Sequence, residues 1–534
     1  MFSQELDPVF GSLALSALVA AVPIVLLFVL LGVFKVKAPV AAISALVLSI
    51  ILAIVGWRMP PVQAISAAAA GIFYGLFPIL WILINALWVY KLTVATPWSE
   101  TFGRTIRSIS NDLRILSILI AFCFGALLES LAGFGAPVAI SAAMLLAAGM
   151  KPFKAAMVSL LANTAPVAFG ALGAPIFALA GVTGLSVQDL ASMAGRQTPF
   201  IAVLVPLLLV FLVDGRRGVR ETWPVAVVAG LVFAIVQFLT SNFFAIELTD
   251  VVAGIATIVA VLVMLKFWHP HHEVEVSGAD QVPVVRPTAR KIVMSVAPYV
   301  IIITIFSIAQ IPVVKAWLDA VGTVTFRWPG LDVVNAAGDP VASQDIHFDH
   351  FRATGTLLFF SGVITTVLYR IRVRQTLDIY GATLKQLRWT IVTVTAVLGL
   401  SFVMNLSGQT STLGVALASA GGFFVVLSPI IGWIGVAITG SDTASNSLFG
   451  SLQVTAAAAT GLPPVLMAAA NSSAGVLGKM LSLQNLAVAA AAVGLEGSES
   501  QLFRKLLPWS LGLLGLITIL IVLQSTTVLG WLVP

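Results

Sequence analysis

The stretch LRILSILIAFCFGALLESLAGFGAP, residues 113–137, joins an apolar run of membrane-spanning length to a break that contains glycine and proline. A helix needs about 20 predominantly apolar residues to cross the bilayer core. Glycine and proline interrupt such a helix, and lipid cannot satisfy the backbone groups that the interruption frees. The stretch therefore predicts a membrane-spanning helix that ends at a break buried in protein or facing a watery cavity.

The composition of the whole chain has the same character. Of its 534 residues, 59% are hydrophobic and 9% are charged, and the mean hydropathy is +1.06. A soluble protein could not cover so much apolar surface, whereas a bilayer accepts it. The net charge of +6 comes from basic residues in short loops between apolar runs, which indicates membrane topology rather than a nucleic-acid partner. The single cysteine, Cys123, excludes an intrachain disulfide and a thiolate metal cage.

Apolar runs recur along the chain and predict an all-α polytopic membrane protein with about 12–14 transmembrane segments. Runs of spanning length lie at 9–31, 39–56, 64–90, 198–213, 222–240, 246–267, 291–311, 352–371, 389–406 and 506–530. Two longer regions, 113–195 and 407–495, are apolar but interrupted. The acidic N-terminus lacks the basic start of a signal peptide, so we expect the first run to be retained. The basic loops are expected in the cytoplasm, which puts both chain ends outside.

The two interrupted regions resemble each other. Asn163-Thr164-Ala165 matches Asp442-Thr443-Ala444, and further matches follow in the same order on both sides. We therefore predict two repeated halves with broken or re-entrant helices, a pattern typical of secondary transporters. The predicted division is a first half at 1–245 with a transport core at about 113–215, a linking span and hydrophilic linker at 246–290, and a second half at 291–534 with a core at about 388–505. The charge pattern makes the halves parallel, whereas transporter repeats are often inverted, and the sequence leaves both open.

The first candidate functional residue is Glu129, which ends an apolar run just before the break. An ionisable side chain at membrane depth is costly, so its presence favours a functional role, here the gain and loss of a proton. The alternative is a glutamate at a helix end in the membrane interface.

A second candidate is the polar island 439–447, together with its partner in the first repeat. Its hydroxyl and amide groups can bind a carboxylate or a hydroxyl, and Asp442 is the only acid there, hence a second candidate proton carrier. The alternative is a short surface loop. The predicted substrate-binding side chains from these segments are Asn163, Thr164, Ser441, Thr443, Ser445 and Asn446.

A third candidate is a pair of cations, Arg196 and Lys479, at matched repeat positions in apolar surroundings. Either cation can bind a carboxylate, the guanidinium in bidentate fashion and the ammonium as a point charge. The alternative is that one or both extend to the membrane interface. Asn471 and Ser472 precede Lys479 and add polar lining.

Nothing in the sequence predicts a cofactor or a metal. The chain has no phosphate-binding G-x-x-x-x-G-K-[ST] motif and no H-E-x-x-H motif. The histidine-rich stretch 269–290 is interpreted as a solvated linker, because no ordered scaffold holds its side chains. The other histidines, His347 and His350, lie in the acidic loop 312–351, outside the predicted core. Transport energy must therefore come from an ion gradient or from the gradient of the substrate itself.

The segments 129–137, 161–170, 440–446, 470–475 and 478–480 resemble the bacterial L-lactate permease family. The likeness covers nearly the whole chain, apart from the region 269–351. It implies proton-coupled uptake of L-lactate, with D-lactate and glycolate as further substrates. It also implies a place in a broad ion-transporter superfamily, some of whose members move a transport domain against a scaffold. It carries over no catalytic motif, so the site residues rest on their chemistry.

We therefore expect a secondary active transporter, not an enzyme, in the bacterial cytoplasmic membrane. Its expected partners are L-lactate and similar small carboxylates, protons and the lipid bilayer, with no nucleic acid. The alternatives are another small organic anion, sodium coupling and, more distantly, an intramembrane enzyme. The sequence leaves open the oligomeric state and the choice between elevator and rocking motion.

Overall fold

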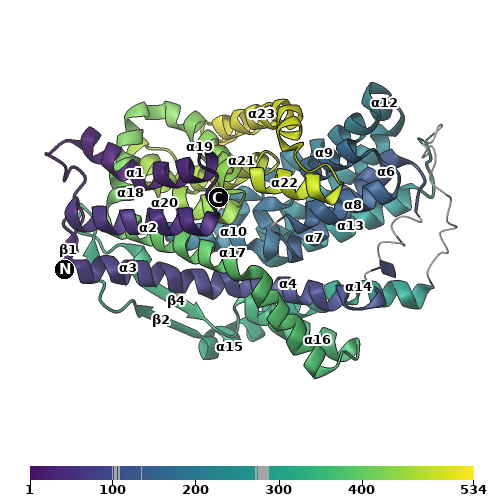
Figure 1. The fold of residues 1–534 in the computed structure, drawn as a ribbon, viewed down its shortest axis with the longest axis horizontal. Coiled ribbons are helices and arrows are strands. Elements are labelled where there is room, and N and C mark those ends of the chain that lie inside the picture. The colour runs from purple at the N-terminus through teal and green to yellow at the C-terminus, as the bar shows by residue number, and fades with distance from the viewer. Residues whose placement is uncertain (99, 102–104, 106–108, 134, 271–273, 275–287) are drawn as a thin grey trace.

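The computed structural model of the chain describes residues 1–98, 100–101, 105, 109–133, 135–270, 274 and 288–534. These residues form a predominantly helical protein with two small two-stranded sheets (Figure 1). Most of the predicted hydrophilic linker lies outside the described residues, as do His271, His272 and Phe134.

The first part of the chain contains β1 and the helical elements up to α13. The helices are α1 (Leu13–Gly32), α2 (Ala38–Val55), α3 (Pro61–Tyr74), η1 (Gly75–Leu80), α4 (Trp81–Val94), α6 (Leu113–Leu116), η2 (Ser117–Phe124), α7 (Gly125–Leu131), α8 (Ala136–Ala147), α9 (Pro152–Ala162), η3 (Val167–Phe169), α10 (Gly170–Thr183), α11 (Val187–Ala194), α12 (Thr198–Phe243), η4 (Ile246–Leu248) and α13 (Thr249–Met264). Strand β1 is Phe2–Ser3.

The second part begins with α14 and contains the remaining strands. The helices are α14 (Ala289–Gln310), α15 (Pro312–Gly322), η5 (Ala342–Gln344), α16 (Thr354–Leu368), α17 (Val373–Ser407), α18 (Gln409–Leu417), η6 (Ala418–Phe423), α19 (Phe424–Thr439), α20 (Asp442–Thr460), α21 (Pro464–Lys479), α22 (Leu483–Ala492), α23 (Glu499–Gln524) and η7 (Gly530–Leu532). The strands are β2 (Thr323–Arg327), β3 (Val333–Val334) and β4 (Asp345–Asp349).

The expected fold class, an all-α polytopic membrane protein with broken helices, is confirmed. Within the described residues, 11 helices are long and apolar enough to cross a membrane, or 12 if one strongly bent pair is counted as a span. Several of these exceed one bilayer crossing. The helix α12 contains both apolar runs expected at 198–213 and 222–240, and it kinks between them at Asp214 and Gly215.

The run expected as a plain span at 64–90 is broken in the middle, which corrects that expectation. Helix α3 ends at Tyr74, the segment η1 contains Phe77 with extended dihedral angles (φ −140°, ψ 120°), and α4 resumes the helix. Gly75 and Pro78, which disfavour an uninterrupted helix, flank this point. The break matters because Ile79, Leu80 and, on α4, Leu83 follow it and line a central cavity.

The centre of the molecule is formed by helices from both interrupted regions. Helix α10 packs against α20, and α21 packs against α19 and α20 (Figure 1). Helix α21 also packs against α11. Helices α19 and α21 approach closely because Gly432 has no side chain; a Cβ there would lie 2.2 Å from the Asn471 carbonyl oxygen. Such small residues are typical of helix contacts in membranes. Helix α17 connects this centre to the N-terminal helices α2 and α3.

The acidic loop expected at 312–351 folds into α15 and an antiparallel hairpin. Strand β2 pairs with β4, with Thr323 opposite Asp349, and β3 pairs in parallel with β1 near the N-terminus. The N-terminus and this loop therefore lie on the same side of the molecule. The expectation that both chain ends lie outside stays a prediction.

Candidate functional site

The first half of the candidate site is built around a helix break at residues 163–166. Helix α9 ends at Ala162, and the following helical segment, Val167–Thr183, is bent from it by 63°. The chain then makes a left-handed turn through Ala171 and Leu172, whose φ angles are 44° and 50°. This turn presents a wall of small and apolar residues rather than hydrogen-bonding side chains.

The second half of the site is a break between α19 and α20. Helix α19 ends at Thr439 and is followed by Gly440, whose φ of 74° suits a glycine at a helix C-terminus. Ser441 then caps the next helix, since its Oγ accepts a hydrogen bond from the Ala444 N–H. The N-terminal end of α20 therefore points toward the first break with its positive dipole end.

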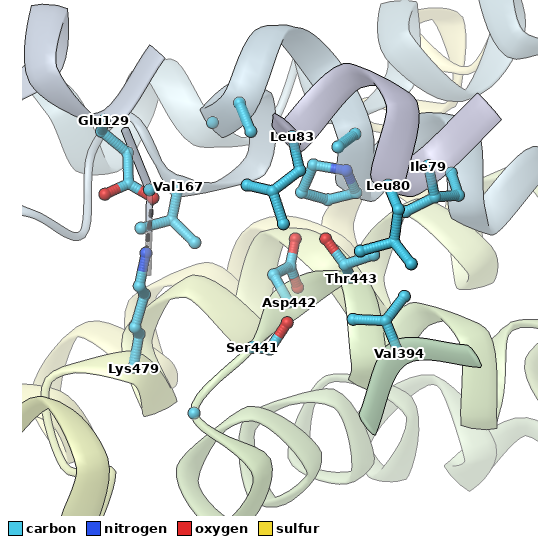
Figure 2. Close-up of a pocket in the computed structure, with 16 residues that line it drawn as sticks. Ile79, Leu80, Leu83, Glu129, Val167, Val394, Ser441, Asp442, Thr443 and Lys479 are labelled. Carbon is cyan, nitrogen blue, oxygen red and sulfur yellow. Dashed lines mark hydrogen bonds and ion pairs between the residues drawn. The ribbon is translucent and has the colours of Figure 1, made fainter. Parts of the chain in front are cut away.

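The two breaks enclose a cavity of about 40 Å³ at the centre of the molecule (Figure 2). Since about 10–15 Å³ suffices for one water, this cavity suits a few waters or the head group of a small ligand. The first region contributes Glu129, Gly133, Val167, Gly170, Ala171, Ala174 and Pro175; the second contributes Gly440, Ser441, Asp442, Thr443 and Lys479; η1, α4 and α17 add Ile79, Leu80, Leu83 and Val394.

An ion pair between the two regions borders this cavity. Lys479 Nζ lies 2.5 Å from Glu129 Oε1, and both side chains are buried, with 7% and 4% exposure. Figure 2 shows the lysine extending from the ribbon of the second half to the glutamate on the first. The other carboxylate oxygen, Glu129 Oε2, accepts a hydrogen bond of 2.9 Å from Asn163 Nδ2. Glu129 can approach this closely because Gly170 has no side chain; a Cβ there would lie 2.9 Å from Oε1.

Asp442 is the second buried carboxylate of the cavity. Its Oδ2 accepts hydrogen bonds from Ser472 Oγ at 2.5 Å and Asn446 Nδ2 at 3.4 Å, whereas Oδ1 has no hydrogen-bond partner among the described residues. Asn446 is held in turn by Asn471, whose Nδ2 donates to Asn446 Oδ1 at 2.9 Å. Asp442 also lies within electrostatic reach of Lys479.

Apart from Arg196, the predicted site residues lie at two kinds of position, in the cavity lining and behind it. Glu129, Asp442, Lys479, Ser441 and Thr443 line the cavity. Behind the cavity wall, in hydrogen bonds to these groups or to the backbone, lie Asn163, Thr164, Ser445, Asn446, Asn471 and Ser472. The roles predicted for these side chains stay predictions.

Arg196 lies apart from the cavity, although it matches Lys479 in sequence. Its Nε donates to Asn242 Oδ1 and its Nη1 donates to the Leu532 carbonyl oxygen, each at 2.8 Å. It does not line the cavity. Among the predicted cations, Lys479 is therefore the one that can meet a ligand there.

A larger cavity of about 230 Å³ adjoins the first and shares Val394, Ser441 and Thr443 with it. It lies between α1, α2, α17 and the N-terminal end of α20 and is mostly apolar. Its wall includes Leu31 and Ala38, on either side of the loop that contains Lys35 and Lys37. This cavity therefore extends from the small one toward the loop between α1 and α2.

Three features of the site were missed by the sequence analysis. One is the apolar wall from η1, which Gly75 and Pro78 could have indicated. Another is a glycine packed against each carboxylate, Gly170 against Glu129 and Gly475 against Asp442. A Cβ at Gly475 would lie 2.8 Å from Asp442 Oδ1. The third is Asp250, a buried acid at the start of an apolar run. Asp250 could have been recognised because it begins an apolar run and has no Lys or Arg near it in the sequence.

Comparison with known proteins assigns the chain to a family. The family model described as L-lactate permease matches residues 16–528. The L-lactate permease of Bacillus subtilis strain 168 is 40% identical over 563 residues, covering 100% of both chains. The glycolate permease GlcA of Escherichia coli strain K12 is 41% identical over 548 residues, covering 98% of both chains.

A solved structure shares the fold. MtrF of Neisseria gonorrhoeae, described within a class of antimetabolite efflux pumps, matches with a TM-score of 0.51 over 91% of this chain and 95% of its own, at 12% identity. At that identity the likeness is one of fold alone. The family match and the full-length relatives are decisive: this chain belongs to the L-lactate permease family.

Proposed function

We propose that the chain is a proton-coupled symporter of L-lactate and related small 2-hydroxy monocarboxylates, D-lactate and glycolate, in the bacterial cytoplasmic membrane. The names of its relatives, L-lactate permease and glycolate permease, support both transport and this substrate class. The bacterial sources of these relatives support the location.

The observation that carries the proposal is the buried Lys479–Glu129 ion pair at the cavity wall. Among the described lining residues, the charged groups are Glu129, Asp442 and Lys479. The ammonium is therefore the group that attracts an anion, and it is already paired with a carboxylate. A substrate carboxylate can replace Glu129 at Lys479, because both present the same chemical group.

Displacement of Glu129 from Lys479 by the substrate carboxylate couples substrate binding to the uptake of a proton. A carboxylate left buried without its cation is strongly unfavourable, so Glu129 takes up a proton as lactate displaces it from Lys479. The cavity then carries the same net charge when it is loaded with lactate and a proton as when it is empty. Either partner alone changes that charge, and a net charge raises the barrier to movement through the membrane. Asp442 remains the second candidate proton carrier.

The cavity walls orient the substrate. The hydroxyl groups of Ser441 and Thr443 and the N-terminal end of α20 bind the polar end of a 2-hydroxy acid. Val167 and Ala174 on the opposite wall offer an apolar surface to the methyl group of lactate. Glycolate lacks that methyl group and fits the same polar wall. The cavity widens during the cycle to admit the whole substrate, and the larger adjoining cavity provides the route toward the cytoplasm.

The test is uptake of radiolabelled L-lactate by liposomes that contain the purified protein, in sodium-free buffer, with an inward proton gradient. We expect transient accumulation above equilibrium that disappears when a protonophore is added. Uptake that never exceeds equilibrium would contradict active transport. Accumulation that occurs only when sodium is added would mean that sodium, and not the proton, is the coupling ion. Accumulation of another organic anion, with lactate excluded, would contradict the substrate assignment.

A further inference from the structure

Asp250 is a third buried carboxyl group in the same region, and the proposed cycle does not use it. It lies in the first turn of α13 and is 1% exposed. Helix α13 packs against α7, which contains Glu129, and the charge of Glu129 acts on Asp250. Asp250 therefore lies behind the cavity wall, within electrostatic reach of the group at which substrate and proton are proposed to exchange.

The hydrogen bonds of Asp250 connect it to the first helix break. Gln237 Nε2 on α12 donates to Asp250 Oδ1 at 3.0 Å and to the Ala165 carbonyl oxygen, within the break, at 3.2 Å. The orientation of Gln237 is fixed by Thr198 Oγ1, which lies 3.2 Å from Gln237 Oε1. Asp250 Oδ2 has no hydrogen-bond partner among the described residues. Only one of the two carboxyl oxygens is therefore satisfied by a donor.

No cation neutralises Asp250 among the described residues that pack around it. The elements against α13 are α12, η2, α7, α10, η4 and α14. Their titratable or charged side chains are Asp214, Arg216, Arg217, Arg220 and Glu221 on α12, Cys123 on η2, Glu129 on α7, Glu247 on η4, and Arg290, Lys291 and Tyr299 on α14. The charged group that acts on Asp250 is Glu129, which is another carboxylate. The charges of α12 lie at or just after its kink, and the nearest, Glu221, is about 24 Å from Gln237 along the helix.

These surroundings favour the neutral form of the carboxyl group. An ionised carboxylate buried without a cation is strongly unfavourable, and the negative charge of Glu129 adds repulsion. The dipole of α13 favours a negative charge in its first turn, but this effect is smaller than the cost of burying an unpaired charge. Glu129 differs in that Lys479 compensates its charge.

We propose that Asp250 is a further proton-binding site of the transport cycle. It is protonated in the conformation described here and releases its proton when its surroundings open to water. The inference rests on the proposed proton-coupled function. In each cycle, the Asp250 carboxylate binds a proton from the water on one side and releases it to the other side, with no covalent bond to the substrate. Loss of this carboxyl group therefore removes one proton from the number carried with each lactate.

The experiment measures the end point of accumulation rather than the rate. Liposomes receive a proton gradient of about one pH unit, in sodium-free buffer, with the membrane potential held at zero. Each coupled proton then multiplies the final ratio of internal to external lactate by about tenfold. We expect Asp250→Asn to reach a final ratio about tenfold lower than the unsubstituted protein. We expect Asp250→Glu to restore most of that ratio.

A matched control separates proton carriage from structural damage. Thr257 lies on the same helix, is fully buried and donates to the Ala253 carbonyl oxygen. Thr257→Val removes a buried polar group without a proton site, so it can slow uptake but leaves the final ratio unchanged. The same final ratio in Asp250→Asn as in the unsubstituted protein would overturn the inference. Absence of proton-driven accumulation in the unsubstituted protein would instead contradict the proposed function.

Infrared spectroscopy tests the inference even if Asp250→Asn does not transport. A protonated carboxyl group has a carbonyl stretching band that an ionised carboxylate lacks. The purified protein at neutral pH should show such a band from Asp250, and the band should be missing in Asp250→Asn and present in Thr257→Val. An identical carboxyl band in all three proteins would overturn the assignment.

Discussion

The two helix breaks that meet at the cavity differ in what they provide. The break at 163–166 contributes an apolar wall, and its asparagine supports Glu129, a carboxylate from another helix. The break at 440–441 contributes hydroxyl groups and its own carboxylate, Asp442. The cation that compensates Glu129, Lys479, comes from the second region. Two segments of similar sequence therefore form different surfaces. One wall of the cavity is apolar, the other is polar, and one ion pair joins the two regions.

The largest effect is expected when Lys479, the cation of the ion pair, is replaced. Lys479→Gln removes the ammonium and leaves Glu129 buried without a cation, which costs about 3–5 kcal/mol. Initial lactate uptake by liposomes, normalised to the amount of folded protein, should fall by about 100-fold or more. Lys154 is a suitable control, because its Nζ donates to the Val213 carbonyl oxygen away from the cavity. Lys154→Gln should retain most of the uptake.

A double substitution distinguishes a structural from a functional ion pair. Glu129→Gln combined with Lys479→Gln replaces two charges by two neutral amides, so thermal stability should recover relative to Lys479→Gln. Lactate uptake should remain lost, because no cation is left to bind a carboxylate. Recovery of uptake together with stability would mean that the pair only holds the two regions together.

The sequence predicted the membrane fold and the breaks better than it predicted the contacts. Apolar runs must become spans, and the breaks at Gly440 and Gly133 followed from local composition, so these features depend on neighbouring residues alone. The pairing of Lys479 with Glu129 joins residues 350 positions apart, which no local pattern specifies. Arg196 and Lys479 match in sequence, yet the guanidinium reaches Asn242 and the C-terminal segment, because different elements surround it.

A smaller effect is expected when Glu129 loses only its ability to bind and release a proton. Glu129→Gln mimics the protonated side chain and leaves Lys479 free for lactate, so exchange of internal for external lactate should continue. Accumulation driven by one pH unit should fall by about tenfold for the lost proton. Glu496, an exposed glutamate outside the cavity, provides the control Glu496→Gln, which should accumulate lactate normally. Loss of exchange in Glu129→Gln would contradict the proposed role of Glu129, because it would show that exchange itself requires the ionised carboxylate.

The smallest effect is expected at the apolar wall, where the comparison makes a prediction about selectivity. Ala174→Val adds two methyl groups to the wall that is proposed to face the methyl group of lactate, and overpacking by this amount costs about 1 kcal/mol. Lactate uptake should fall by about fivefold, whereas glycolate, which has no methyl group, should be transported with little change. Competition between the two labelled substrates in one liposome preparation measures the ratio directly. Ala180→Val, on the same helix but outside the cavity lining, controls for general effects on α10 and should leave the ratio unchanged. An equal loss for both substrates in Ala174→Val would mean that this wall does not contact the methyl group, and the division into a polar and an apolar wall would lose its functional meaning.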